Sequence, residues 1–173
     1  KAVVVENPLH IETLSTSENN KFGLCSGART ILSVGTLRLE KRHDVLIDAF
    51  KLISDDFPDV KLSIVGDGPE RANLGNRVRG HGLDHRVVFH GAVRNVSRFY
   101  RSSQFLVVCS DYESFGLVAI EALSHELPVL GFKRCEGLVQ FVTNDLNGYL
   151  VDIASDEVID LSLSMRVFLQ DQT

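Results

Sequence analysis

Two glutamates separated by seven residues, Glu113 and Glu121, are the side chains of this sequence best placed to bind a substrate. Glu113 lies in a polar turn, and an apolar, helix-like stretch that contains Glu121 comes after it. The residues at the start of that stretch are Phe115, Gly116 and Leu117. Free amides at a helix start bind phosphate, and carboxylates accept hydrogen bonds from sugar hydroxyls. The alternative is that both glutamates are ordinary helix-start and surface charges.

A basic turn supplies a second group of candidate residues. It begins at Gly35 and contains Arg38, Lys41 and Arg42, just before a predicted helix. Glycine allows the backbone to turn closely there. Cations at a helix start lie at the positive end of the helix dipole, where an anion such as a diphosphate would stabilise them. Taken alone, the turn is also explained by a solvated basic loop, which is the simpler interpretation.

A third turn contains two glycines, Gly66 and Gly68. It does not complete the dinucleotide-binding pattern G-x-G-x-x-G, because Arg71 occupies the place of the last glycine. Pro69 is suited to the first position of a helix, where its missing N–H costs nothing. The turn therefore predicts either a tight strand-to-helix connection or a ligand contact.

Together, the first two groups predict a site for a diphosphate that carries a sugar. The amides of Gly116 and Leu117 would bind phosphate, and Lys41 would neutralise the diphosphate from the opposite side. Glu121 would accept hydrogen bonds from a ribose, and Glu113 from the attached sugar. Because these carboxylates do not form a metal-ligand pattern, sugar recognition fits the site better than phosphoryl transfer does.

The elements that position these turns follow from an alternation of short β-branched runs with longer amphipathic segments. Strands are predicted at residues 3–5, 31–34, 61–65, 86–90, 105–109, 128–131 and 148–151, and helices at residues 43–53, 70–79, 116–124 and 156–169. The alternation predicts one doubly wound, Rossmann-like α/β domain with a parallel sheet. Ligands of such sheets lie beyond the carboxyl ends of the strands.

Composition excludes several classes of function. A net charge of −5 over 173 residues argues against a nucleic-acid-binding protein. Cys25, Cys109 and Cys135 are too widely spaced to indicate a zinc site or a disulfide framework, which favours a reducing, cytoplasmic location. Among the histidines, glycines flank His81 and His90 ends a predicted strand, so we expect no metal site. No apolar run is long enough to span a bilayer.

The residues from Glu113 to Glu121 resemble the E-x7-E motif of the family 4 (group 1) glycosyltransferases, which have the two-domain GT-B fold. Glu40 and Lys41, followed by Asp44, resemble the E-K-G-x-D pattern of the same family. Residues 7–8, 64–69, 89–91, 127–129, 136–137 and 147–151 extend the similarity. The ordering of these matches across many turns makes coincidence a poor explanation.

The resemblance implies a retaining, metal-independent transferase of the hexosyltransferase type. It would move a sugar from a UDP- or GDP-sugar to a glycan or lipid-linked acceptor, as in polysaccharide biosynthesis, without a cofactor. Lys41 would stabilise the leaving diphosphate and Glu113 would hold the sugar hydroxyls as the catalytic pair. No protein nucleophile would be needed, and catalysis would be largely electrostatic.

The same resemblance assigns the remaining donor contacts. Phe115, Gly116 and Leu117 would contribute backbone contacts to phosphate and sugar, and Glu121 would hold the ribose. The base would lie near Val93, in the loop after the strand at residues 86–90.

Two positions, Thr36 and Glu126, depart from the family pattern, and Arg38 is a candidate to compensate for the first. Thr36 follows Gly35 where the family usually has arginine, and Arg38, two positions further on, is the candidate substitute in the phosphate-binding turn. Glu126 occupies a position where the family usually has glycine or another small residue.

The resemblance also predicts the domain organisation. Residues 1–173 would form the C-terminal, nucleotide-sugar-binding domain, and an acceptor-binding N-terminal domain would lie outside this sequence. We expect the chain alone to fold, to bind nucleotide weakly and to have negligible transferase activity. The whole enzyme would work in the cytoplasm, with peripheral contact to the membrane through the other domain.

Two alternatives of a different kind remain open at this point. One is a catalytically inactive module that binds nucleotide or carbohydrate, and the other is a GT-B epimerase or sugar phosphorylase. No lysine in the sequence is a clear candidate for binding a pyridoxal group, which disfavours the phosphorylase.

Overall fold

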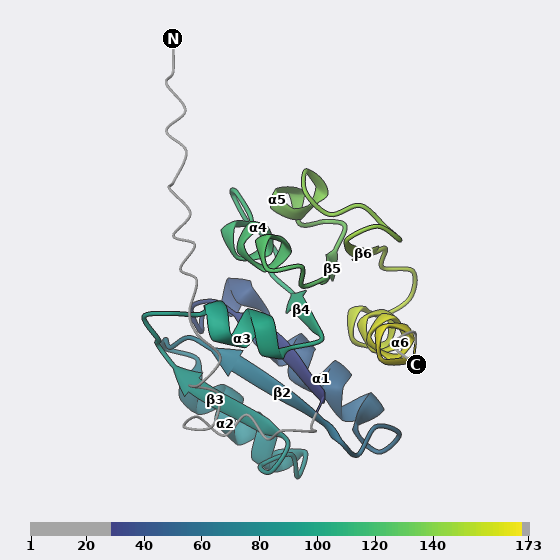
Figure 1. The fold of residues 1–173 in the computed structure, drawn as a ribbon. Helices are drawn as coiled ribbons and strands as arrows, with labels where there is room; N and C mark the ends of the chain where they lie inside the picture. Colours follow the sequence, from purple (N-terminus) through teal and green to yellow (C-terminus); the bar gives the residue numbers. More distant parts are fainter. Residues whose placement is uncertain (1–28, 171–173) are drawn as a thin grey trace.

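A six-stranded parallel sheet organises the chain (Figure 1). The computed structural model describes residues 29–170, so the strand predicted at residues 3–5 and the match at residues 7–8 lie outside the described part. The strands are β1 (Arg29–Val34), β2 (Val60–Val65), β3 (Val87–Gly91), β4 (Phe105–Val108), β5 (Val129–Phe132) and β6 (Gly148–Val151). Their order across the sheet is β3-β2-β1-β4-β5-β6, which confirms the predicted doubly wound fold.

Helices connect the strands. They are α1 (His43–Ser54), α2 (Arg71–Gly80), α3 (Ser97–Ser102), α4 (Leu117–Ser124), α5 (Glu136–Val139) and α6 (Glu157–Gln170), with a short 3-10 helix η1 (Leu39–Lys41) before α1. The sequence missed α3 and α5 because six and four residues are too few to show a helical period. Within the described residues, no helix is long and apolar enough to cross a membrane.

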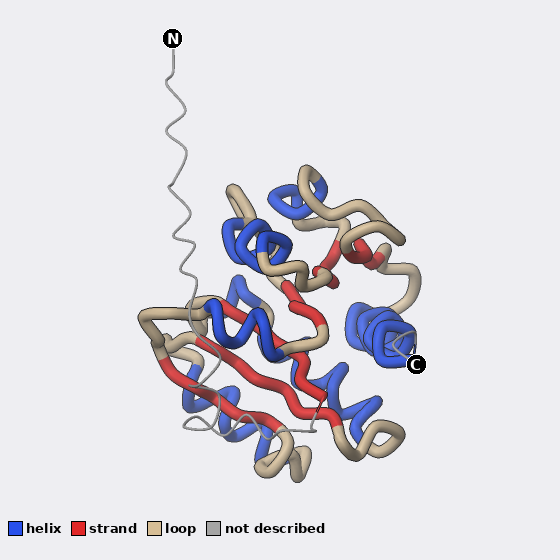
Figure 2. The backbone as a smooth tube through the Cα atoms, in the orientation of Figure 1, coloured by secondary structure: helices blue, strands red, loops and turns tan. Residues whose placement is uncertain are grey.

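The helices cover both faces of the sheet (Figure 2). Successive residues of β1 point to opposite faces, so Ile31 packs with α1, α2 and α6, whereas Leu32 packs with α3, α4 and α5. The four residues of β4 are all buried, as the continuous apolar run at residues 105–109 predicted for a central strand. The sheet is therefore buried between two hydrophobic clusters.

The chain changes direction across the sheet between β1 and β4. From β1 it proceeds outward to β2 and β3, and then returns to β4, which pairs with β1 on the other side. The turns after these two neighbouring strands therefore start at adjacent carboxyl ends. In open α/β sheets, this is the point at which ligands bind.

Candidate functional site

The turns after β1 and β4 meet through Lys41 and Glu113. Lys41 Nζ donates a hydrogen bond to Glu113 Oε1 at 2.5 Å, although the two residues are 72 positions apart in sequence. Ser110 Oγ donates to the same oxygen at 2.8 Å. The side chains are 21% and 16% exposed, so solvent reaches the ion pair but does not surround it. Glu113 Oε2 has no hydrogen-bond donor among the described residues.

The start of α4, directly after this pair, requires glycine. Gly116 has φ 57°, and a Cβ atom there would lie 2.6 Å from the carbonyl oxygen of Gly137. A Cβ at Gly137 would in turn lie 2.3 Å from the carbonyl oxygen of Glu113. The turn that carries Glu113 is thus packed directly against the start of α5, where only glycine fits.

The amides at the start of α4 are unpaired within the described part of the chain. In residues 29–170, no acceptor receives a hydrogen bond from the N–H groups of Phe115, Gly116 or Leu117. Phe115 is 47% exposed and Leu117 is partly buried, whereas Gly116 is buried, so the turn is exposed at Phe115. Unpaired amides at a helix start favour an anion, as the sequence predicted for this turn.

Glu121 has a partner that the sequence did not reveal. The hydroxyl of Tyr100, on α3, donates a hydrogen bond to Glu121 Oε2 at 2.9 Å. Tyr100 is 2% exposed, and burial, followed by the charge of Glu121, raises the pKa of the phenol, which therefore stays protonated as a donor. The half-buried carboxylate is thereby stabilised, and its Oε1 has no donor among the described residues. An aromatic pair at Phe99 and Tyr100 was the only signal in sequence, and it resembles ordinary core.

The glycine-containing turn after β2 supports the basic turn. A Cβ at Gly66, where φ is 142°, would lie 1.8 Å from the carbonyl oxygen of Gly35, and one at Gly68 would lie 2.5 Å from that of Leu37. These distances favour the interpretation of residues 66–68 as a tight connection. Gly35 itself has room for a Cβ, whose nearest neighbour would be Lys41 Cδ at 4.0 Å. The strict requirement for glycine therefore lies at Gly66 and Gly68, and not at Gly35.

The two remaining predicted residues, Arg38 and Val93, follow the carboxyl ends of β1 and β3. Arg38 precedes η1 and is exposed, and its guanidinium has no hydrogen-bond or ion-pair partner in the described part of the chain. Val93, in the loop after β3, is partly buried against the cluster beneath α3 and α4. The side chain of Val93 therefore packs against this cluster, whereas its neighbours Ala92 and Arg94 are exposed.

Two of the histidines, His81 and His90, have partners within the protein. His81 Nε2 lies 2.8 Å from Asp48 Oδ1, and His90 Nε2 lies 3.1 Å from Ser63 Oγ with its ring edge-on to Phe99. Across residues 29–170, no three His, Cys, Asp or Glu side chains gather as metal ligands. Cys109 and Cys135 are buried thiols whose pKa is raised by burial.

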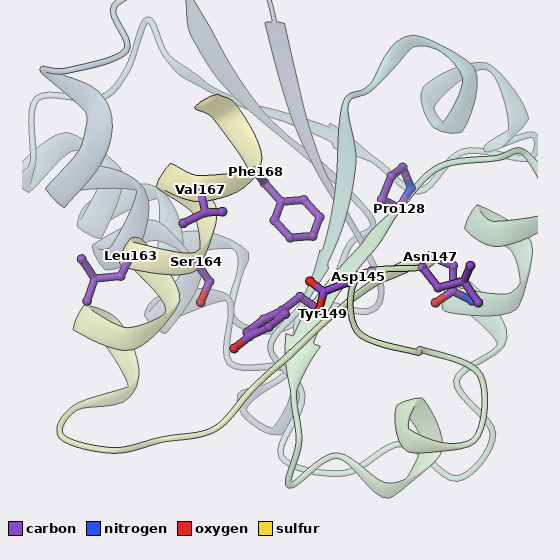
Figure 3. Close-up of a pocket in the computed structure, with 10 residues that line it drawn as sticks. Pro128, Asp145, Asn147, Tyr149, Leu163, Ser164, Val167 and Phe168 are labelled. Carbon is purple, nitrogen blue, oxygen red and sulfur yellow. The ribbon is translucent and has the colours of Figure 1, made fainter. Parts of the chain in front are cut away.

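A cavity of about 540 Å³ lies elsewhere, between α6 and the amino ends of β5 and β6 (Figure 3). Pro128, Tyr149 and Phe168 are among the residues that line it. Pro128 directly precedes β5, so this cavity opens at the edge of the sheet opposite to Lys41 and Glu113. It is therefore separate from the candidate site.

The fold and the site together define an α/β domain of the nucleotide-binding type, with a charged pair and a helix start at the point where strand order reverses. Residues 15–172 match the family described as "Glycosyl transferases group 1". The chain belongs to this family and corresponds to the C-terminal half of its GT-B fold, as the motif resemblance predicted.

Individual relatives agree with this assignment. The chain is 36% identical over 124 residues to an "Uncharacterized glycosyltransferase" of Haemophilus influenzae, covering 72% of this chain and 35% of the relative. It is 31% identical over 137 residues to the "Amylovoran biosynthesis glycosyltransferase AmsD" of Erwinia amylovora, covering 79% and 38%. The pneumococcal O-GlcNAc transferase GtfA, solved with UDP and GlcNAc, has a similar fold, with a TM-score of 0.77 and 24% identity over 85% of this chain and 30% of that one. The chain thus spans between 30% and 38% of these relatives' length.

Proposed function

We propose that this chain is the donor-binding half of a retaining, metal-independent glycosyltransferase that uses a nucleotide-diphosphate sugar. The observation that carries the proposal is the contact between Lys41 and Glu113 at 2.5 Å, beside the unpaired amides at the start of α4. A relative of similar fold was solved with UDP and GlcNAc, so a UDP-sugar is the first donor to test and a GDP-sugar the second.

The cation and the amides would act on the same diphosphate. The Lys41 ammonium has three N–H groups and gives one to Glu113, so two remain for phosphate oxygens. The amides of Phe115, Gly116 and Leu117 add neutral donors on the other side. Negative charge increases on the diphosphate as its bond to the sugar breaks. Groups fixed around that charge therefore stabilise the transition state more than the ground state.

The two glutamates would recognise the neutral parts of the donor. Glu113 binds Lys41 and Ser110 through Oε1, which leaves Oε2 to accept hydrogen bonds from sugar hydroxyls. Glu121 binds Tyr100 through Oε2, which leaves Oε1 for a ribose hydroxyl. The base would lie against the backbone around Val93. Arg38, exposed and without a partner in residues 29–170, would add charge at the phosphates in place of the usual arginine at Thr36.

Transfer with retention needs no protein nucleophile in this scheme. The acceptor hydroxyl oxygen forms a bond to the anomeric carbon on the face from which the diphosphate leaves. The bond between that carbon and the phosphate oxygen breaks, and the departing phosphate takes the hydroxyl proton. Lys41 and the α4 amides balance the charge of the phosphate throughout.

The acceptor would be a glycan or a lipid-linked sugar, read by an N-terminal domain. Because the chain spans only 35% and 38% of its relatives from Haemophilus influenzae and Erwinia amylovora, we propose that the rest of a longer protein supplies that domain. Peripheral contact with the cytoplasmic face of a membrane would also belong to it. The chain alone would then bind nucleotide but transfer no sugar.

Calorimetric titration of the full chain with UDP, GDP and their sugars tests the proposal. Removing a hydrogen bond to a charged group costs about 1.5–3 kcal/mol, so Lys41→Ala and Glu121→Ala should each weaken binding at least tenfold. Lys51→Ala, which removes a partly exposed lysine of α1 from its ion pair with Asp55, is the matched control and should bind normally. Addition of EDTA should leave the affinity unchanged.

The outcomes separate the proposal from its alternatives. If neither UDP nor GDP bound, the donor-site assignment would be wrong, and a carbohydrate-binding module would be favoured. If the chain alone turned over donor onto an acceptor, the assignment of the acceptor site to another domain would be wrong.

A further inference from the structure

Arg42 has a backbone conformation that most side chains avoid. It connects η1 to α1 with φ 48° and ψ 40°, in the left-handed region. Glu40 and Lys41, directly before it, resemble a family pattern with glycine at this position, and glycine adopts this conformation without strain. An arginine here costs folding energy, so its side chain is expected to make contacts that offset the cost.

The side chain of Arg42 enters a network of ion pairs. Its Nη1 lies 3.1 Å from Asp111 Oδ1, and its Nη2 contacts Glu157 at the start of α6. Arg134, in the turn after β5, contacts the same two carboxylates, Asp111 at 3.1 Å and Glu157 at 2.9 Å. Four separate segments of the chain are thereby joined at the carboxyl edge of the sheet.

This network lies next to Lys41 and Glu113 in sequence and in space. The amide of Asp111 donates a hydrogen bond to the carbonyl oxygen of Glu40 at 2.9 Å. Glu40 and Arg42 therefore both bind Asp111, and Lys41, between them, binds Glu113. The residues on both sides of Lys41 are therefore held in place, and Lys41 is the residue proposed to bind the diphosphate.

The charge balance of the network disfavours direct binding of an anion. Arg42 Nε also lies 3.5 Å from Asp44 Oδ1, so two guanidinium groups meet three carboxylates. All five side chains are between 23% and 47% exposed, and the two guanidiniums are already paired. Their charge is thus used within the protein, in contrast to that of Arg38.

We propose that Arg42 is a positioning residue: through Asp111, Glu157 and Arg134 it holds Lys41 and Glu113 in the arrangement that receives the diphosphate of the donor. This inference rests on the proposed function of the Lys41–Glu113 pair. Lysine has a long, flexible stem, and fixing the turn beneath it lowers the entropy that its ammonium loses on binding phosphate.

The variant Arg42→Gly separates positioning from folding. It removes the guanidinium at a φ that glycine prefers, so the melting temperature of the full chain should be unchanged or slightly higher. Affinity for UDP or GDP, whichever the wild type binds, should fall about three- to tenfold. Affinity for the corresponding nucleoside, which carries no phosphate, should not change. A general loosening of the fold would lower both affinities.

A double-mutant cycle identifies the residue through which Arg42 acts. If Arg42 positions Lys41, then Arg42→Gly should weaken diphosphate binding in the wild type but have no further effect in Lys41→Ala. Arg134→Gln reaches the same network from an ordinary backbone position, and should weaken diphosphate binding in the same direction. Arg77→Gln, which removes an arginine of α2 that pairs with Asp48 of α1, is the matched control.

The results that would overturn the inference differ from those that would overturn the proposed function. If Arg42→Gly and Arg134→Gln both bound UDP and GDP like the wild type, while Lys41→Ala did not, the positioning role would be wrong and the donor site would stand. Equal losses for diphosphate and nucleoside would also overturn it. If the wild-type chain bound no nucleotide, both the positioning role of Arg42 and the proposed function would be wrong.

Discussion

At the scale of the residue, the candidate site depends on which oxygen of Glu113 and of Glu121 already accepts hydrogen bonds from the protein. The protein occupies Glu113 Oε1 with Lys41 and Ser110, and Glu121 Oε2 with the Tyr100 hydroxyl. Each glutamate is thereby held in one orientation, with its second oxygen unpaired within residues 29–170. The proposed recognition of a sugar donor by these glutamates requires preorganisation of this kind.

Tyr100→Phe tests this at a single hydroxyl. The change keeps the ring and its packing but frees Glu121, so we expect UDP or GDP affinity to fall about threefold to tenfold, in line with the loss of one hydrogen bond to a charged group. Discrimination between the ribonucleotide and its 2′-deoxy analogue should also diminish. Calorimetric titration measures both quantities. Tyr112→Phe, at a tyrosine that is 63% exposed, is the control; equal effects of the two variants would contradict the role of Tyr100.

At the scale of the element, the first turn of α4 and the start of α5 act as one unit. Gly116 and Gly137 allow the two backbones to approach so closely that a methyl group fits at neither position. Helix α5 has only four residues and little stability of its own, so its contact with the Glu113 turn helps to define both.

Gly116→Ala should therefore disrupt the site and the fold together. The new Cβ would meet the Gly137 carbonyl at 2.6 Å, on a residue with φ 57°, and we expect a loss of about 2–4 kcal/mol in the free energy of unfolding. Urea denaturation gives this quantity. Gly80→Ala is the control, since a Cβ there meets nothing within 4 Å and alanine favours a helix. A stable Gly116→Ala variant would show that the packing is not as tight as described.

At the scale of the whole molecule, one buried histidine links stability to pH. His43 begins α1, is 4% exposed, and its Nδ1 has no partner in the described part of the chain. Burial, followed by the charge of Lys41, lowers the pKa of His43 from 6.5 to about 4. Between these two values the unfolded chain binds a proton that the folded chain does not bind. The folded state is therefore destabilised as the pH falls from 6.5 towards 4.

His43→Leu should remove this pH dependence. The shift corresponds to about 3 kcal/mol that is present above pH 6.5 and lost by about pH 4. Unfolding free energies measured in urea at pH 7.0 and 4.5 should differ less in His43→Leu than in the wild type, by about 2–3 kcal/mol. His85→Gln, at an exposed histidine, should behave like the wild type. The same pH slope in all three proteins would exclude His43 as the source.

The fold class and the family of this protein could be predicted from its sequence alone. Alternating β-branched and amphipathic segments predicted the doubly wound fold, and in residues 29–170 the predicted strand and long-helix bounds lie within two residues of those observed. The resemblance of residues 113–121, and of several other turns, to family motifs predicted the family to which the chain belongs. These features are local, because a side-chain period, a turn residue or a motif is complete within a few residues.

Only the tertiary structure decided which of these local features meet. The order of the strands places β1 beside β4, so Lys41 contacts Glu113 across 72 positions of sequence. The hydroxyl of Tyr100 reaches Glu121 from a helix too short to show a period, and Arg42 reaches Asp111 only from a left-handed backbone that its own sequence disfavours. Such contacts depend on how whole elements pack on the sheet. The free energy that selects these contacts is therefore shared among many residues. No single segment of the chain is enough to predict them.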